Sequence, residues 1–230
     1  MPTPANRAGV GERITMKYYK VLGQDGKPCN GGSGTYHLPT KRKNGTWKPG
    51  KWMPAIEELE PCENGYHLCR PQDLIHWLNA QIFEAEYKGE CIEQGDKIVV
   101  EQVRLLRRVE TWNEKTARLF ACWCVRQVWD LLGDERSKNA VRVAEKYARG
   151  EATDEELAEA RAEANVAAWD AASVAAWDAA RAEANVAAWD AAWDAAWAEA
   201  RAEAKAEARD AARAEARAAQ TIRLLEMLEG

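Results

Sequence analysis

Long apolar runs, a surplus of basic residues and a signal peptide are all missing from this 230-residue sequence, and each absence excludes a class of protein. No stretch approaches the roughly 20 apolar residues that a membrane span needs. Residues 1–7 lack the apolar core of a signal peptide. We therefore expect a cytoplasmic protein, in the host cytoplasm if the gene is viral, without membrane contact. The formal net charge of −5 gives no broad basic field, so charge does not favour nucleic-acid binding.

Phenylalanine is scarce, with two residues against eleven tryptophans, and glycine and proline are absent from residue 151 to residue 229. Alanine, which has the highest helix propensity, dominates that stretch and predicts helix. The pattern along the chain predicts an α+β protein in four parts. They are a disordered arm over 1–15, a small mixed α+β domain over 16–110, a two-helix segment over 111–150, and an all-α repeat region over 151–230 that forms one long helix or a helical hairpin.

The aromatic and β-branched composition typical of strands occurs in three segments, 16–22, 82–88 and 97–106. The second of these strands is predicted to end at Gly89. A proline opens a short helix over 71–78, because a missing backbone N–H costs nothing at the first helical position. The stretch over 27–61 is rich in Gly, Pro and Lys and predicts long loops.

Capping boxes mark two helix starts, because a Thr hydroxyl and a Glu carboxylate three residues later can satisfy free backbone N–H groups. One box spans 111–114, and its helix is predicted to run on to Gly133. The other box spans 153–156 and starts the repeat region. Between them, a helix over 137–149 is predicted to end at Gly150, since glycine is the usual residue after a helix.

A twelve-residue string recurs letter for letter in the last third of the chain, where residues 161–172 reappear as 181–192 with a shorter copy at 173–180. A helix turns once every 3.6 residues, so the repeating unit Ala-Trp-Asp-Ala advances by about 40° at each step. The apolar side chains therefore change sides near 181–185, where the helix spirals or breaks. Exposed tryptophan rows favour packing against a partner surface. The predicted interaction residues are Trp169, Trp177, Trp189, Trp193 and Trp197.

Charges in the repeat region follow the same four-residue spacing, with basic residues from Arg201 to Arg217 and acidic residues from Glu199 to Glu207. Like charges four residues apart on a helix repel slightly. Such rows favour pairing with another helix whose facing charges are opposite, so we predict self-association through residues 151–230. The alternative is that replication slippage produced a neutral, tolerated helix.

The densest group of metal-binding residue types contains Cys62, His67 and Cys69, with Cys29 upstream. These four side chains can supply a tetrahedral zinc site, although the Cys-x6-Cys spacing is not a standard one. The alternative, without a cofactor, is that the reduced cysteines of a cytoplasmic protein act as small buried hydrophobes. A third interpretation pairs Cys69 or Cys29 as a nucleophile with His67 or His37.

The residues from Cys62 to Leu74 follow the pattern Cys-x-x-Gly-Tyr-His-x-Cys-x-Pro-x-x-Leu. Phe-x-Ala-Glu-x-x-Gly at 83–89 and Asp-Lys-Ile at 96–98 come after it. This set resembles an uncharacterised domain common in phage and bacterial genomes, whose core is Cys-x-x-Gly-[Phe/Tyr]-His-x-Cys. Residues 111–157 are similar to Ala-rich bacterial proteins, some of them labelled immunity-like. Together these resemblances imply a phage or bacterial accessory protein and bring no assigned activity with them.

Residues 65–68, Gly-Tyr-His-Leu before a short helix, are also similar to a strand of ADP-ribosyltransferase-like folds. This similarity implies catalytic roles for Tyr66 and His67. A later glutamate would orient the ribose in that case, the candidates being Glu84, Glu86 and Glu90. The alternative is that Tyr66 and Leu68 are alternating core residues of a strand.

Two functions are consistent with these patterns. The favoured one is a non-enzymatic interaction and assembly protein, an accessory protein of phage–host conflict that oligomerises through its Ala/Trp repeats. The alternative is a small nucleotide-directed transferase in the N-terminal domain, with the helices as an assembly device. Any chemistry is expected within residues 16–110.

Overall fold

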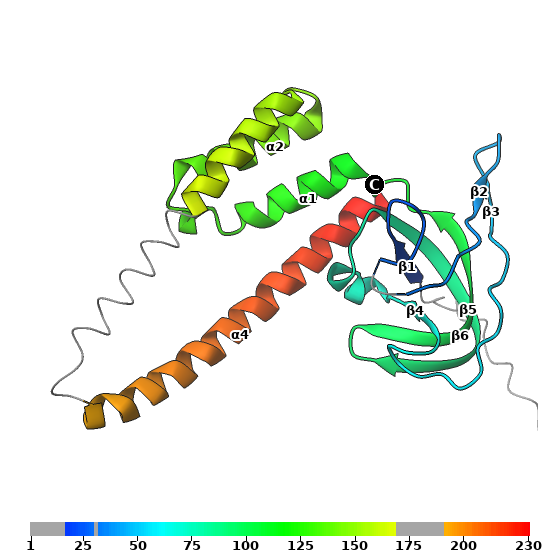
Figure 1. The fold of residues 1–230 in the computed structure, drawn as a ribbon, viewed down its shortest axis with the longest axis horizontal. Coiled ribbons are helices and arrows are strands. Elements are labelled where there is room, and N and C mark those ends of the chain that lie inside the picture. The colour runs from blue at the N-terminus through cyan, green and yellow to red at the C-terminus, as the bar shows by residue number, and fades with distance from the viewer. Residues whose placement is uncertain (1–16, 30–31, 169–190) are drawn as a thin grey trace, which may run out of the picture. The chain divides into compact units, whose positions relative to one another are not determined.

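The computed structural model describes residues 17–29, 32–168 and 191–230, and it shows a mixed α+β protein (Figure 1). The α+β class expected from the sequence is therefore confirmed. Contacts between Cα atoms divide the chain after Arg108 into two compact units. The predicted arm over 1–15 lies outside the described residues.

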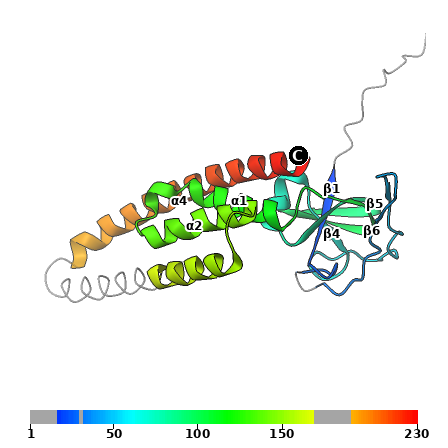
Figure 2. The ribbon, with the colours of Figure 1, turned by 90° about the horizontal axis from the view of Figure 1, so that it is seen from above.

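The N-terminal unit contains a four-stranded antiparallel sheet in the order β1-β5-β6-β4. Its strands are β1 (Tyr18–Leu22), β4 (Tyr66–Leu68), β5 (Gln81–Gln94) and β6 (Lys97–Arg108). The three strands predicted from composition correspond to β1, β5 and β6. Figure 2 shows the long β5–β6 hairpin side by side with the shorter strands.

A short bridge closes this sheet on itself. The backbone N–H of Tyr19 donates to the carbonyl of Cys69, and the N–H of Cys69 donates to the carbonyl of Tyr19, both at 2.8 Å. The first strand is thereby joined to the residue that follows β4. The contact is a bridge of a single residue pair between the two outer strands.

The region before β4, which was predicted to form loops, pairs with an edge of the sheet. It contains a small hairpin of β2 (Thr40–Lys41) and β3 (Trp47–Lys48). After the hairpin, an extended segment donates backbone hydrogen bonds of 2.9 to 3.1 Å to β6. The donor–acceptor pairs are Gly50 with Leu105, Met53 with Val103, and Ile56 with Glu101.

Strand β5 does not end at Gly89, as its composition predicted, but continues to Gln94. The register shifts between Lys88 and Cys91, and Gly89 adopts a φ of 82° at this bulge. The carboxylate of Glu101 on β6 accepts the N–H of Glu90 at 3.1 Å, so the bulge is satisfied and the strand can continue. A two-residue turn of Gly95 and Asp96 then leads into β6.

Buried side chains from one face of the sheet and from the preceding loops form a hydrophobic core. Its fully buried members come from β1, β4 and β6 (Leu22, Leu68, Ile98, Val100, Val103 and Leu105), and Ile82 and Val99 are fully buried as well. The helix predicted over 71–78 is a 3-10 helix, η1 (Pro71–His76), whose Leu74 is also fully buried.

The C-terminal unit begins with α1 (Glu114–Arg126), and its start corrects a prediction. The capping box predicted over 111–114 is wrong, because Asn113 and Thr116 form the box instead. The hydroxyl of Thr111 donates to the carbonyl of Leu228 at 2.7 Å and does not cap the helix. The helix predicted to reach Gly133 ends at Arg126 and is followed by a short 3-10 helix.

Two other helix boundaries are confirmed. Helix α2 (Glu135–Arg149) ends at Gly150, which adopts the left-handed conformation with a φ of 79°. In the box over 153–156, the Glu156 carboxylate accepts the Thr153 N–H at 2.7 Å, and the Thr153 hydroxyl accepts the Glu156 N–H at 3.2 Å. Helix follows this box from 154 to 168.

The last helix is α4 (Ala191–Glu229), whose C-terminal turns contact α1 and bury Leu224 completely. Trp193 and Trp197 lie on this helix, whereas Trp169, Trp177, Trp189 and the predicted change of side near 181–185 lie outside the described residues. None of the helices in the described part of the chain is both long and apolar enough to cross a bilayer.

We predict that Gly65→Ala destabilises the N-terminal unit by about 2–4 kcal/mol. Gly65 has a φ of 132°, and a Cβ there would lie 2.3 Å from Cγ1 of Val99. Gly45→Ala is the matched control, because Gly45 also has a positive φ of 84° but has open space around it. The control is expected to cost only about 1 kcal/mol. Urea unfolding of the full chain, with hydrogen exchange of β6 peptides, measures the stability of both variants. Equal losses of stability in the two variants would contradict this account.

Candidate functional site

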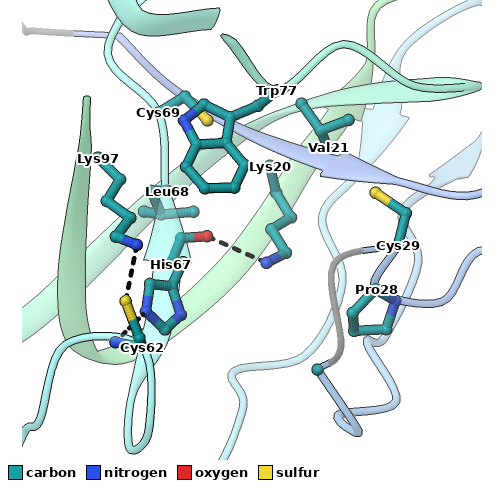
Figure 3. Close-up of a pocket in the computed structure, with 11 residues that line it drawn as sticks. Lys20, Val21, Pro28, Cys29, Cys62, His67, Leu68, Cys69, Trp77 and Lys97 are labelled. Carbon is teal, nitrogen blue, oxygen red and sulfur yellow. Dashed lines mark hydrogen bonds between the residues drawn. The ribbon is translucent and has the colours of Figure 1, made fainter.

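A half-open cavity of about 240 Å³ lies in the N-terminal unit beside β1, β4 and the start of β6 (Figure 3). The loop after β1 and the end of η1 complete its walls. The polar and aromatic side chains that line it are those of Lys20, Cys29, Cys62, His67, Cys69, Trp77 and Lys97. These residues come from five separate segments of the chain, so only the folded sheet brings them together.

Strand alternation places Lys20 on the core side of the sheet. Successive side chains of a strand point to opposite faces, so Lys20 shares its face with Leu22, which is fully buried. Across the strand pair, Lys20 lies directly opposite Phe83 of β5, which is also buried. A lysine side chain is therefore inserted where the pattern otherwise requires an apolar residue.

The ammonium group of Lys20 has few polar partners. Its Nζ donates to the backbone carbonyl of His67 at 3.1 Å and lies 4.9 Å from the centroid of the Tyr36 ring. Burial lowers the pKa of Lys20 to about 8, because the charged form loses hydration that these contacts do not replace. The nearby thiols of Cys69 and Cys29 oppose this effect and raise the pKa.

A second lysine and a histidine lie on the other side of the cavity. The Nε2 atom of His67 accepts the backbone N–H of Cys62 at 3.0 Å, and Lys97 Nζ lies 3.0 Å from Sγ of Cys62. Burial lowers the pKa of His67, and the charges of Lys20 and Lys97 lower it further. The ring is therefore neutral near pH 7 and carries its proton on Nδ1.

The described lining of the cavity contains no carboxylate, and neither lysine forms an ion pair with a described Asp or Glu. The nearby acidic side chain of Asp73 is instead paired with Arg70. Figure 3 shows the side chains of Lys20 and Lys97 extending toward His67 from either side. The cavity thus presents uncompensated positive charge to whatever enters it.

The four predicted zinc ligands all line this cavity, but the described residues contain no cluster of three or more metal-binding side chains. The lone pair of His67 Nε2 is already used by the N–H of Cys62. Cys69 is buried, and burial raises the pKa of its thiol to about 12, so the thiolate that zinc requires is disfavoured. The four residues meet at one cavity without the arrangement of a metal centre.

The three predicted catalytic residues are not brought together. Tyr66 is a buried core residue, and its hydroxyl donates to the carbonyl of Pro54 at 3.0 Å. Glu86 forms an ion pair with Arg104 on the neighbouring strand and does not line the cavity. Only His67 faces the site.

Lys20 and Lys97 were not predicted as site residues. For Lys20 the sequence offers no signal, because aromatic and apolar residues flank it on both sides and strand 16–22 does not alternate between polar and apolar residues. For Lys97 the sequence offers no signal either, since it lies at the start of β6 next to a turn.

No family model, curated protein or solved structure matches the chain. The chemistry of the cavity therefore carries the functional argument.

We predict that Lys20→Met stabilises the protein at pH 7, by about 2 kcal/mol. The substitution removes a charge whose burial is unfavourable and loses one hydrogen bond. Between pH 8 and pH 10.5 the folded protein releases the Lys20 proton while the unfolded chain retains it, so Lys20 makes wild-type stability rise with pH. The advantage of the variant should therefore shrink across that range.

Urea unfolding at pH 7 and pH 9.5, with hydrogen exchange of β1 and β5 peptides, measures this difference. Lys43→Met is the control, because Lys43 is exposed in the turn between β2 and β3. A Lys20→Met variant that is less stable than wild type at both pH values would contradict the prediction.

Proposed function

We propose that the chain is a non-enzymatic binding and assembly protein, whose N-terminal unit holds a small anionic ligand between Lys20 and Lys97. The observation that carries this proposal is a cavity with two lysines, a neutral histidine and no carboxylate in its described lining. A concave site lined by one sign of charge concentrates ligands of the opposite sign. Ammonium groups act as point-charge partners for phosphate and carboxylate oxygens.

The dimensions of the cavity limit the ligand. A volume of about 240 Å³ is smaller than the roughly 300–1,000 Å³ of pockets for drug-sized molecules, so a compact molecule fits best. The indole N–H of Trp77 is already donated to the carbonyl of Asp96 at 3.0 Å. Trp77 therefore offers its apolar ring, and the two lysines offer the charge.

A binding role is favoured over the nucleotide-directed transferase. That reaction needs a glutamate to orient the ribose, and no glutamate belongs to the described lining of the cavity. Glu84 and Glu86 both face arginines of β6, where they form ion pairs with Arg107 and Arg104.

Titration with inorganic phosphate and with acetate, followed by amide chemical shifts at low salt, tests ligand binding. We predict shifts in β1, β4 and the start of β6, and an affinity about tenfold lower in Lys97→Gln, since one charged contact is worth about 1.4 kcal/mol. Lys43→Gln should bind as wild type does. Wild-type protein that shows no shifts at the cavity, or equal affinity in Lys97→Gln, would refute the proposal.

We also propose that copies of the chain associate through residues 151–230. Every residue from 210 to 219 of α4 is exposed, although the turns after it are packed. In the helix over 154–168, Leu157, Ala160 and Ala167 are buried, whereas Val166 is 52% exposed. Both helices therefore carry surface that the rest of the described C-terminal unit leaves open.

A second copy of the chain is the partner that the charges favour. Basic residues recur every four positions from Arg201 to Arg217, and acidic residues recur likewise from Glu199 to Glu207. An antiparallel neighbour of the same sequence brings each basic row opposite an acidic one, which removes the repulsion between like charges along one helix. Alanine at the intervening positions permits close approach of the two backbones.

Sedimentation equilibrium of the full chain over a hundredfold range of concentration tests this association. We predict a concentration-dependent dimer or larger oligomer, weakened at 1 M salt because charge rows contribute to it. The double variant Trp193→Ala/Trp197→Ala should remain helical by circular dichroism but associate more weakly. Trp47→Ala, in the N-terminal unit, is the matched control, and a wild-type monomer at every concentration would overturn the assembly proposal.

A further inference from the structure

We infer that Lys20 is a reactive amine that reversibly captures a small 2-oxo acid as an imine, with Lys97 holding the carboxylate of the same molecule. This inference rests on the proposed anion-binding cavity and names the class of ligand it takes. It also assigns the two lysines different roles, one covalent and one electrostatic.

The placement of Lys20 supports a chemical role. Its side chain lies on the inner face of β1, opposite Phe83, which is 2% exposed. It forms no ion pair with a described carboxylate, and its one described hydrogen bond is donated to the carbonyl of His67. A carbonyl oxygen carries no full negative charge. It accepts the hydrogen bond but does not compensate the positive charge of the ammonium group, as a carboxylate would.

The surroundings of Lys20 keep a fraction of the molecules with Lys20 as the free amine, which is the nucleophilic form. The titratable groups that face it are Cys29, Tyr36, His67 and Cys69. Burial raises the pKa of the Tyr36 hydroxyl and of the Cys69 thiol, so neither group is anionic near pH 8. With a pKa of about 8, half of Lys20 is free amine at pH 8. An ordinary lysine is deprotonated in roughly one molecule in 250 at that pH.

The competing nucleophile in the cavity is disfavoured. Burial raises the pKa of Cys69 to about 12, and the thiol form reacts poorly with carbonyl carbons. A desolvated lysine near a second cationic group is, by contrast, a recognised arrangement for imine formation. In this cavity burial is the larger cause of the lowered pKa of Lys20, and Lys97 lies on the other side of His67.

The step is balanced without any oxidant or reductant. The lone pair of neutral Lys20 Nζ attacks the carbonyl carbon, and a C–N bond forms as the C=O π bond breaks to give a carbinolamine. The carbinolamine then loses its oxygen as water, which takes the two hydrogens of the original amine, and a C=N bond remains. Addition of water reverses the sequence and releases the ligand.

Borohydride trapping on the full-length chain tests the inference. The protein is incubated with glyoxylate or with acetaldehyde at pH 8, reduced with borohydride, and analysed by peptide mass spectrometry. We expect Lys20 to be labelled at least tenfold faster than exposed Lys43 in the same molecule, a comparison that needs no variant. Labelling should fall about 15-fold at pH 6.5, where little of the free amine remains.

Variants separate the two lysine roles. Lys20→Arg should lose the adduct while keeping the charge, and Lys43→Met should retain it. Lys97→Gln should slow labelling by glyoxylate several-fold but leave labelling by acetaldehyde unchanged, because only glyoxylate carries a carboxylate.

The outcomes distinguish this inference from the function on which it rests. If phosphate binds at the cavity but Lys20 is labelled no faster than Lys43, the imine inference is overturned and the binding proposal stands. If Lys20 is labelled rapidly but Lys97→Gln changes neither phosphate binding nor the preference for glyoxylate, the assignment of Lys97 and the anion proposal are overturned together.

Discussion

One pair of backbone hydrogen bonds governs the N-terminal unit. The two 2.8 Å bonds between Tyr19 and Cys69 join the first strand to the residue after β4 and so close the sheet. Tyr19 directly precedes Lys20, and Cys69 itself lines the cavity. Because Tyr19 is fixed against Cys69, Lys20 is fixed beside His67, and the carbonyl of His67 receives its ammonium group. The site is thus a direct product of how the sheet closes.

The sequence predicted those parts of the fold that depend on neighbours along the chain. Strand composition located β1, β5 and β6, and the box over 153–156 located a helix start, since both signals are local. The capping box predicted over 111–114 is wrong because of a tertiary contact. The Thr111 hydroxyl donates to a carbonyl 117 residues away. Strand β5 likewise continued past Gly89 because a carboxylate of β6 satisfies the bulge.

The candidate site could be predicted only in part, because its residues come together from separate segments of the chain. His67 and the cysteines were found because they are chemically distinctive and mostly close together in the sequence. Lys20 and Lys97 were missed, since lysine is normally a surface residue and nothing local separates these two from the others. Placing an amine on the inner face costs stability, because burial disfavours its charged form.

The bond between Thr111 and Leu228 ties the two ends of the C-terminal unit together. The chain between these anchors includes the repeated twelve-residue string. A four-residue unit spans about 6 Å in a helix. Closure entropy grows slowly with length, by roughly 0.6 kcal/mol for each doubling. A change in the number of repeat units between the two anchors therefore costs little closure entropy.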